Sequence, residues 1–252
     1  MTFRMGALAA MLAIAGLTAG CQTMDVGGLV GAGSKAVQAF SLSDQEVVTL
    51  SDQSCQQMDA ENKVASANSK YNKRLQRVVK PLTKQLNGQT PNFKVYQTQD
   101  VNAWAMANGC IRVYAGLMDK MNDDELRGVI GHEMGHVELG HSKKAMQTAY
   151  GLSAARDAAA ATGNSVVTQL NSSQLGELSE AFLNAQFSQS QESAADDYSF
   201  DLLTERKLKT QGLVSAFEKL AALDGGESSV MSSHPGSKER AQRMQQRIDA
   251  AK

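Results

Sequence analysis

The feature that most constrains this chain is His132-Glu133-Met134-Gly135-His136, a sequence of the form H-E-x-x-H. Residues four apart lie on the same face of a helix, so the two imidazoles can bind one metal ion between them. Glu133 projects beside that pair, where its carboxylate can take a proton from an attacking water. Two histidine ligands and a carboxylate base are typical of zinc hydrolases. Three of the chain's four histidines fall within ten residues, which argues against a chance match.

The stretch around this motif predicts a helix. Asn122, followed three residues later by Glu125, forms a capping-box pattern at its start. Glycine inside a helix costs about 1 kcal/mol relative to alanine. Three such glycines therefore predict that another element packs closely against this helix: Gly128, Gly131 and Gly135.

His141 resembles a third ligand, but its spacing does not fit. It follows His136 by five residues, which places it about 140° around a continuous helix. The metzincin pattern requires glycine and histidine where this chain has Leu139 and Ser142. We therefore expect the third ligand to come from elsewhere in the chain.

The composition predicts a globular protein. Of 252 residues, 42% are hydrophobic and 20% charged, which suffices for a real core. The net charge of −1 gives no indication of nucleic-acid binding. Few aromatic residues and abundant Ala and Gln predict that helix dominates. Together with the strands expected below between residues 93 and 114, this gives an α+β, mainly helical fold with a small sheet beside the motif helix.

Residues 1–20 have the features of a lipoprotein signal peptide. Arg4 is followed by an apolar run to Ala19, and Leu17-Thr18-Ala19-Gly20-Cys21 resembles a bacterial lipobox, with Thr18 where Leu is commoner. The alternative is an ordinary signal peptide followed by a chance cysteine.

If Cys21 is lipidated, residues 21–42 form a flexible, glycine-rich tether and residues 43–252 form the zinc metallopeptidase domain. Gln22 after the cysteine resembles Gram-negative lipoproteins that are sorted to the outer membrane. The expected location is therefore the outer membrane, with the domain lipid-anchored and facing the periplasm.

The remaining elements follow from capping, periodicity and turn signals. Helices are expected from Ser43 to about Gln57, over 70–86 with a kink or break at Pro81, over much of 143–175 with a looser stretch at 163–173, and over 210–223 and 237–250. Strands are expected at 93–97, 103–107 and 110–114, the last two joined by a hairpin turn at Asn108-Gly109. This hairpin either pairs with an extended substrate or is purely structural.

Cys55 and Cys110 are the two cysteines that remain besides Cys21. In an exported chain they predict a disulfide, which would stabilise the fold by roughly 3–5 kcal/mol. Two unpaired buried thiols are the alternative.

Glu192 and Asp196 form a second chemical element. Their spacing of four places both carboxylates on one helix face. Glu192 can complete a His-His-Glu zinc site, and Asp196 can orient a ligating imidazole. Taken alone the pair is weak evidence, because most acidic pairs on helices are solvated.

Together these motifs resemble the HtpX/BepA-type gluzincin family of membrane-associated zinc endopeptidases. Besides H-E-M-G-H and Glu192-x-x-Ala195-Asp196, the segments that carry the resemblance are Asn102-Ala103-Trp104-Ala105, Asn108-Gly109, Gly116-Leu117, and Ser233-His234-Pro235 with Arg240. The resemblance implies a gluzincin-like fold with one Zn²⁺ per chain, held by His132, His136 and Glu192. It also implies proteolysis and a role in envelope protein quality control.

Four further roles are expected. Glu133 is the general base. Asp196 is either a proton donor, as family descriptions give it, or an orienting group for a ligand. Three roles are open for His234. It occupies the water position on zinc, as the corresponding histidine of BepA can, or it stabilises an oxyanion, or it caps a loop. Arg240 either braces the site or lies on the surface.

The resulting hypothesis is a membrane-anchored periplasmic zinc metalloendopeptidase that hydrolyses misfolded or envelope proteins, with other envelope proteases as candidate partners. The alternative is a chaperone or assembly factor for outer-membrane proteins whose zinc site is latent and plugged by His234. Glu133 argues for the enzyme, because a structural site needs no base.

Overall fold

The computed structural model describes residues 42–156, 170–223, 234 and 237–251. Its helices are α2 (Asp44–Glu61), α3 (Lys70–Val79), α4 (Ala115–Lys120), α5 (Asp123–Glu138), α6 (His141–Arg156), α7 (Ser172–Leu183), α8 (Gln189–Glu205), α9 (Gln211–Ala222) and α10 (Ser237–Ala250). Its strands are β1 (Asn92–Tyr96), β2 (Ala103–Ala105) and β3 (Cys110–Tyr114). The predicted α+β, mainly helical class is confirmed. The signal peptide, Cys21 and the tether up to residue 41 lie outside the described residues.

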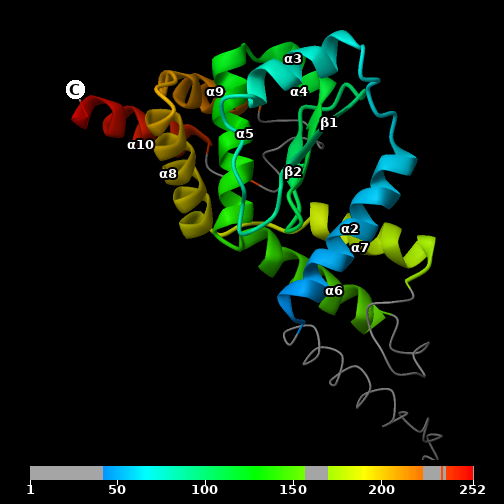
Figure 1. Cartoon of the computed structure of the whole chain (residues 1–252). Coiled ribbons are helices and arrows are strands. Elements are labelled where there is room, and N and C mark those ends of the chain that lie inside the picture. The colour runs from blue at the N-terminus through cyan, green and yellow to red at the C-terminus, as the bar shows by residue number, and fades with distance from the viewer. Residues whose placement is uncertain (1–41, 157–169, 224–233, 235–236, 252) are drawn as a thin grey trace, which may run out of the picture.

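The three strands form one mixed sheet in the order β1-β3-β2. β1 runs parallel to β3, whereas β2 pairs antiparallel with it, with Trp104 opposite Arg112. The predicted hairpin is present: Gly109 has a φ of 79°, and its N–H donates to the Met106 carbonyl at 3.0 Å. This order leaves β2 at an edge of the sheet, next to α5 (Figure 1).

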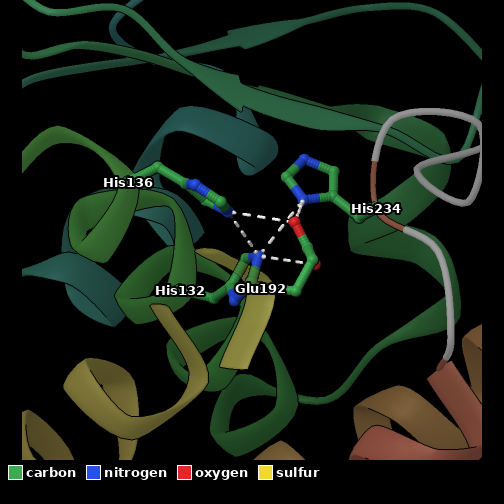
Figure 2. Close-up of side chains that lie close together, drawn as sticks. All are labelled: His132, His136, Glu192 and His234. Carbon is green, nitrogen blue, oxygen red and sulfur yellow. Dashed lines mark hydrogen bonds and ion pairs between the residues drawn. The ribbon is translucent and has the colours of Figure 1, made fainter. Parts of the chain in front are cut away.

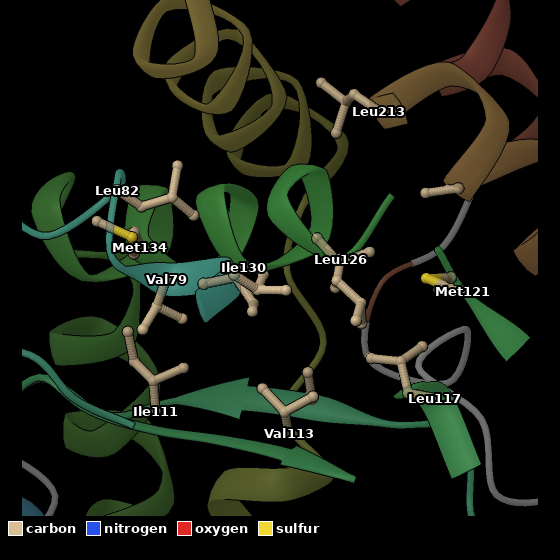
Figure 3. Packing of buried hydrophobic residues seen from close by; sticks show 14 of the residues in the cluster. Val79, Leu82, Ile111, Val113, Leu117, Met121, Leu126, Ile130, Met134 and Leu213 are labelled. Carbon is tan, nitrogen blue, oxygen red and sulfur yellow. The ribbon is translucent and has the colours of Figure 1, made fainter. Parts of the chain in front are cut away.

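The sheet separates two hydrophobic cores, because successive strand residues point to opposite faces. Ile111 and Val113 of β3 belong to the core shared with α3, α4, α5, α8, α9 and α10. Figure 3 shows them facing Leu126 and Ile130 of α5. Cys110 belongs to the second core, which α2, α6 and α7 build on the other face. The sheet and both cores thereby fix the position of α5.

Helix α5 begins as the sequence predicts. The Asn122 side chain accepts hydrogen bonds from the N–H groups of Asp124 and Glu125, each at 2.9 Å. The Glu125 carboxylate in turn accepts from the Asn122 N–H at 2.8 Å, which completes the capping box. Lys219 of α9 pairs with the same carboxylate at 2.7 Å. The start of α5 is therefore held both by its own cap and by a neighbouring helix.

The glycines of α5 mark where α8 and α9 pack, as expected. A Cβ added at Gly131 would lie 2.6 Å from Ser199 Oγ, and one at Gly135 would lie 3.0 Å from the Ala195 carbonyl oxygen. Gly128 meets α9 in the same way. In Figure 1, α8 accordingly runs along α5 on the side away from the sheet. This close approach sets the distance between the metal-binding motif and the carboxylates of α8.

Several element boundaries differ from the prediction. α2 continues to Glu61, α3 ends at Val79 rather than near residue 86, and the short helix α4 was not predicted. Of the kink or break expected at Pro81, the structure has the break. The loop expected at 163–173 overlaps the start of α7 at Ser172, and residues 157–169 lie outside the described ranges. Within those ranges, no helix combines the length and apolarity needed to cross a bilayer.

A disulfide ties α2 to the sheet. Cys55 of α2 and Cys110 of β3 are bonded, with their Cα atoms 6.5 Å apart, and both side chains are buried. Arg112 reinforces the same junction, because its guanidinium pairs with Asp59 of α2 at 2.8 Å. Helix α2 is therefore an integral part of the folded domain.

Candidate active site

Helix α5 presents the three residues of the H-E-x-x-H motif to one buried point. The Nε2 atoms of His132 and His136 lie 3.0 Å apart. The Glu133 side chain is buried beside them. Spacing by one helical turn thus brings both imidazoles together, as predicted from the sequence.

Helix α8 adds the two predicted carboxylates. Glu192 Oε1 lies 3.3 Å from His136 Nε2, and its Oε2 lies 3.5 Å from His132 Nε2. Asp196 Oδ1 lies 2.9 Å from His132 Nδ1. A carboxylate in that position accepts the Nδ1–H and leaves the Nε2 lone pair of His132 available for a metal.

His234 reaches the same point from the segment between α9 and α10. Its Nδ1 is 3.2 Å from His132 Nε2 and 2.9 Å from Glu192 Oε1, as Figure 2 shows. On its other side, Nε2 is 3.6 Å from Glu133 Oε1. The side chain is buried in the site, beside the two motif histidines and Glu192.

The four side chains form a donor set that suits zinc. Ligand atoms of His132, His136, Glu192 and His234 all lie within 4.8 Å of one another. A tetrahedral site with bonds of about 2.0–2.1 Å has ligand atoms about 3.3 Å apart. The shortest separations here, 2.9 to 3.3 Å, are close to that value. Three imidazoles and one carboxylate, without thiolates, match known zinc sites.

Electrostatics favour metal-binding protonation states of His132, His136 and Glu192, whereas Glu133 and Glu192 outweigh burial and raise the pKa of His234. Burial lowers the pKa of His132 and His136, so both imidazoles are neutral near pH 7. Burial opposes ionisation of Glu192, but the charge of His234 and hydrogen bonds from His136 and His234 outweigh it and lower the pKa of that carboxyl. Burial raises the pKa of Glu133 to about 7. Its Oε1 atom has no hydrogen-bond partner among the described residues.

Arg240 of α10 braces both carboxylates. Its Nε and Nη2 lie 3.0 and 2.7 Å from the two oxygens of Asp196, and its Nη1 lies 2.5 Å from Glu192 Oε2. The guanidinium also lies over the Phe217 ring, 4.1 Å from its centroid. Of the two roles expected for Arg240, the structure supports bracing the site.

Two neighbours of His136 were not predicted. His141 Nδ1 lies 3.1 Å from His136 Nδ1. α5 ends at Glu138 and the chain turns at Gly140, with a φ of 73°, so the continuous-helix geometry used to place His141 was wrong. Phe187 stacks on His136 with the ring centroids 3.8 Å apart. Gly140, a glycine just after the end of α5, was the sequence signal that could have predicted this turn.

The site is closed in this structure. Glu133 and His234 line a cavity of only about 20 Å³. Its other walls are Asn102 with Trp104 and Ala105 of β2, then Phe182 and Leu183 at the end of α7, and Ala185 and Phe187 in the segment between α7 and α8. A peptide therefore reaches Glu133 only after this segment or His234 moves.

Comparisons with known proteins agree with the geometry. Residues 69–248, which include every site residue described above, match peptidase family M48. Metalloprotease LoiP of Escherichia coli (strain K12) is 54% identical over 245 residues, 97% of this chain and 97% of the relative. Metalloprotease YcaL of the same organism is 51% identical over 249 residues, 97% of this chain and 98% of the relative. Protease HtpX of Actinobacillus pleuropneumoniae (serotype 5b) is 36% identical over 62 residues, 23% of this chain.

Proposed function

The chain belongs to peptidase family M48 and is a metalloendopeptidase, and we propose that zinc is its metal, held by His132, His136 and Glu192. The observation that carries this proposal is the convergence of these side chains from α5 and α8 on one buried point. When bound, zinc would polarise the scissile carbonyl and make the attacking water more acidic.

Glu133 acts as the general base. Its carboxylate takes a proton from the water that attacks the peptide carbonyl, and later delivers that proton to the leaving amine nitrogen. The buried Oε1 atom, which has no hydrogen-bond partner among the described residues, can receive the proton. Burial raises the pKa of this carboxyl, which makes it a stronger base toward the proton of the water.

Asp196 orients His132 rather than donating a proton to substrate. Its two oxygens already contact His132 Nδ1 and the guanidinium of Arg240. His141 contacts Nδ1 of His136, just as Asp196 contacts Nδ1 of His132. Each motif imidazole is thereby fixed with Nε2 directed to the metal position.

Strand β2 is the element that pairs with the substrate backbone. Within the hairpin, Tyr114 N–H donates to the Asn102 carbonyl and Met106 N–H to the Cys110 carbonyl, so the peptide groups of Ala103 and Ala105 face away from β3. Asn102 Oδ1 and Ser142 Oγ already bond the Ala103 N–H and the Ala105 carbonyl. An extended peptide can add to this edge as a further strand through the Ala103 carbonyl and the Ala105 N–H. Such pairing would place the scissile bond beside Glu133, which lines the same cavity as Ala105.

The closed arrangement is a latent form of the enzyme. His234 Nδ1 stands among the ligand atoms, so when a metal is bound it would compete with an attacking water for the fourth position. The plugged site was also the basis for expecting a non-enzymatic chaperone or assembly factor. Membership of a peptidase family favours the enzyme over the chaperone or assembly factor. The proposal keeps one part of that alternative, the latent metal site.

We propose that the enzyme acts at the cell envelope. The signal peptide at 1–20, the lipobox cysteine Cys21 with its tether over 21–42, and the domain over 43–252 support a lipid-anchored protein on the periplasmic face of the outer membrane. The disulfide between α2 and β3 is compatible with an oxidising compartment. Misfolded or envelope proteins are the proposed substrates, in a quality-control role.

The decisive test combines metal analysis with casein hydrolysis. The wild-type chain should contain one zinc and hydrolyse unfolded casein, whereas Glu133→Gln should retain zinc and lose at least about a hundredfold in turnover. Glu177→Gln, the same change at an exposed position of α7, is the matched control. A chain without a transition metal, or full activity of Glu133→Gln, would contradict the proposal.

A further inference from the structure

We propose that the outer face of α3 binds a bilayer that carries anionic phospholipid headgroups. Residues 62–99 contain eight Lys and Arg and no Asp or Glu, although the whole chain has a net charge of −1. Helix α3 lies within this segment and is amphipathic: Leu75 and Val78 are buried, and the cations lie on the opposite side. The cationic face consists of four exposed residues: Lys70, Lys73, Arg77 and Lys80.

The charges of this face disfavour the helix that carries them. Lys73, Arg77 and Lys80 follow one another at intervals of four and three residues, so like charges are neighbours on the helix surface. Such pairs destabilise a helix, and Lys70 and Lys73 in the first turn also oppose the helix dipole. Helix α3 has no acidic residue to offset these effects. An external anionic surface would offset them.

The fold leaves most of this positive charge unpaired. Arg77 pairs with Asp123 of α5 at 3.1 Å, but it shares that carboxylate with Arg74, and its side chain is 63% exposed. Lys73 and Lys80 form no ion pair with any described residue. Figure 1 shows α3 on the outside of the molecule, with α5 and β1 on its inner side. Within the described part of the chain, the cationic face is therefore open to a partner.

The lipid anchor proposed above favours a membrane as this partner, and the inference rests on that anchor. Cys21 precedes Leu42, the first described residue, by 21 positions. At about 3.3–3.6 Å per residue, such a chain reaches up to about 70 Å. A compact domain of the size of residues 43–252 has a radius of gyration of about 17 Å. The tether is therefore longer than the domain is wide, so every face can reach the bilayer and charge selects among the faces.

The shape of the cationic face suits a flat anionic surface. Each Lys or Arg near such a surface adds to the attraction, which is screened over about 10 Å at 0.1 M salt. From Lys70 to Lys80 the helix axis advances by only about 15 Å, so all four cations can lie near the headgroups together. Figure 1 shows α6 at the opposite end of the molecule from α3. Binding through α3 would thus turn α6 away from the bilayer.

The test measures how fast a neutral reagent acetylates individual lysines of the mature full-length chain on lipid vesicles. Phosphatidylglycerol in the vesicles should slow acetylation of the three lysines of the cationic face at least about threefold relative to phosphatidylcholine alone, and high salt should remove the difference. Lys144, exposed on α6, should react equally on both kinds of vesicle. Equal rates for the cationic face as well would mean that it is only solvated and would overturn the proposal.

Paired substitutions test whether the face itself is responsible. Lys73→Gln combined with Lys80→Gln should abolish the slower acetylation of Lys70. Because this change removes neighbouring like charges, the urea midpoint should stay unchanged or rise. Lys144→Gln combined with Lys238→Gln, at exposed positions of α6 and α10, is the matched control and should keep the slower acetylation of Lys70. Loss of the effect in this control too would show that net charge is responsible, and the proposal would fail.

Mass spectrometry of the mature N-terminus separates this proposal from the anchor. Slower acetylation of the cationic face in a chain with unmodified Cys21 would support the face and contradict the anchor. A lipidated Cys21 with equal acetylation on both kinds of vesicle would keep the anchor and overturn the proposal. Protection in isolated cell envelopes but not on phosphatidylglycerol vesicles would assign the face to a different partner, and would also overturn it.

Discussion

Replacing Arg240 by leucine should destabilise the fold severely. The Arg240 side chain is 7% exposed and pairs with Asp196 and Glu192, whose side chains are 0% and 2% exposed. Leucine retains apolar volume but removes the guanidinium shared by both buried carboxylates, which leaves Asp196 only the longer pair with Arg243 at 3.6 Å. Breaking a buried ion pair from one side costs about 3–5 kcal/mol, and we expect a loss of that size in the free energy of unfolding.

Helix α10 provides a matched control at Arg247. This guanidinium also lies over a phenylalanine ring, 4.4 Å from the Phe200 centroid, and also pairs with carboxylates of α8. Its side chain is 33% exposed, and those of Asp197 and Asp201 are 41% and 66% exposed. Exposed pairs contribute about 0–1 kcal/mol, so Arg247→Leu should cost no more than about 1 kcal/mol.

Urea denaturation of metal-free chains measures both losses directly. Asp196→Asn removes one buried charge, so Arg240→Leu combined with Asp196→Asn should cost less than the sum of the single changes. In metal titrations, Arg240→Leu should also weaken zinc binding by about 10- to 100-fold, because Asp196 would no longer hold His132 in place. Equal losses for Arg240→Leu and Arg247→Leu, or additive losses in the double variant, would refute the bracing role.

Three other properties can be predicted. Because burial raises the folded-state pKa of Glu133 from 4.5 to about 7, stability of the metal-free chain should fall as pH rises between these values. Urea denaturation should then find Glu133→Gln more stable than wild type above pH 7 by about 3 kcal/mol, and equal below pH 4.5. If His234 holds the enzyme closed, His234→Ala should raise casein hydrolysis with zinc retained. A loss of about a hundredfold would instead indicate oxyanion stabilisation, and unchanged kinetics would exclude both roles. Non-reducing mass spectrometry should find Cys55 bonded to Cys110, and two free thiols would contradict this.

Much of the site could be predicted because its chemistry lies in short-range spacing. A four-residue interval determines that His132 and His136 share a helix face, whatever the rest of the fold does. The same holds for Glu192 and Asp196 on α8. The close contact between α5 and α8 could also be predicted, because glycines inside α5 destabilise the helix and are expected where another element packs closely against it.

The remaining features depend on contacts between distant segments. His141 was misplaced because the turn at Gly140 redirects the chain, and helical periodicity does not extend past that turn. The parallel pairing of β1 with β3 joins segments that no local signal relates. Arg240 could be named from its motif, but its position between two carboxylates follows only from the packing of α10 against α8.

The charges of the closed site explain why the motif and Arg240 belong together. Glu133, Glu192 and Asp196 are all buried, and Arg240 is the guanidinium that pairs with two of them. When the three carboxylates are ionised and the imidazoles neutral, a net charge of minus two remains, which a divalent cation would neutralise. Metal binding and folding stability are therefore coupled in this domain.

Glu133 is the exception among the three carboxylates, because its Oε1 has no hydrogen-bond partner among the described residues and its burial opposes folding. Such a group is expected where a base must meet water, and a purely structural metal site would be more stable without it.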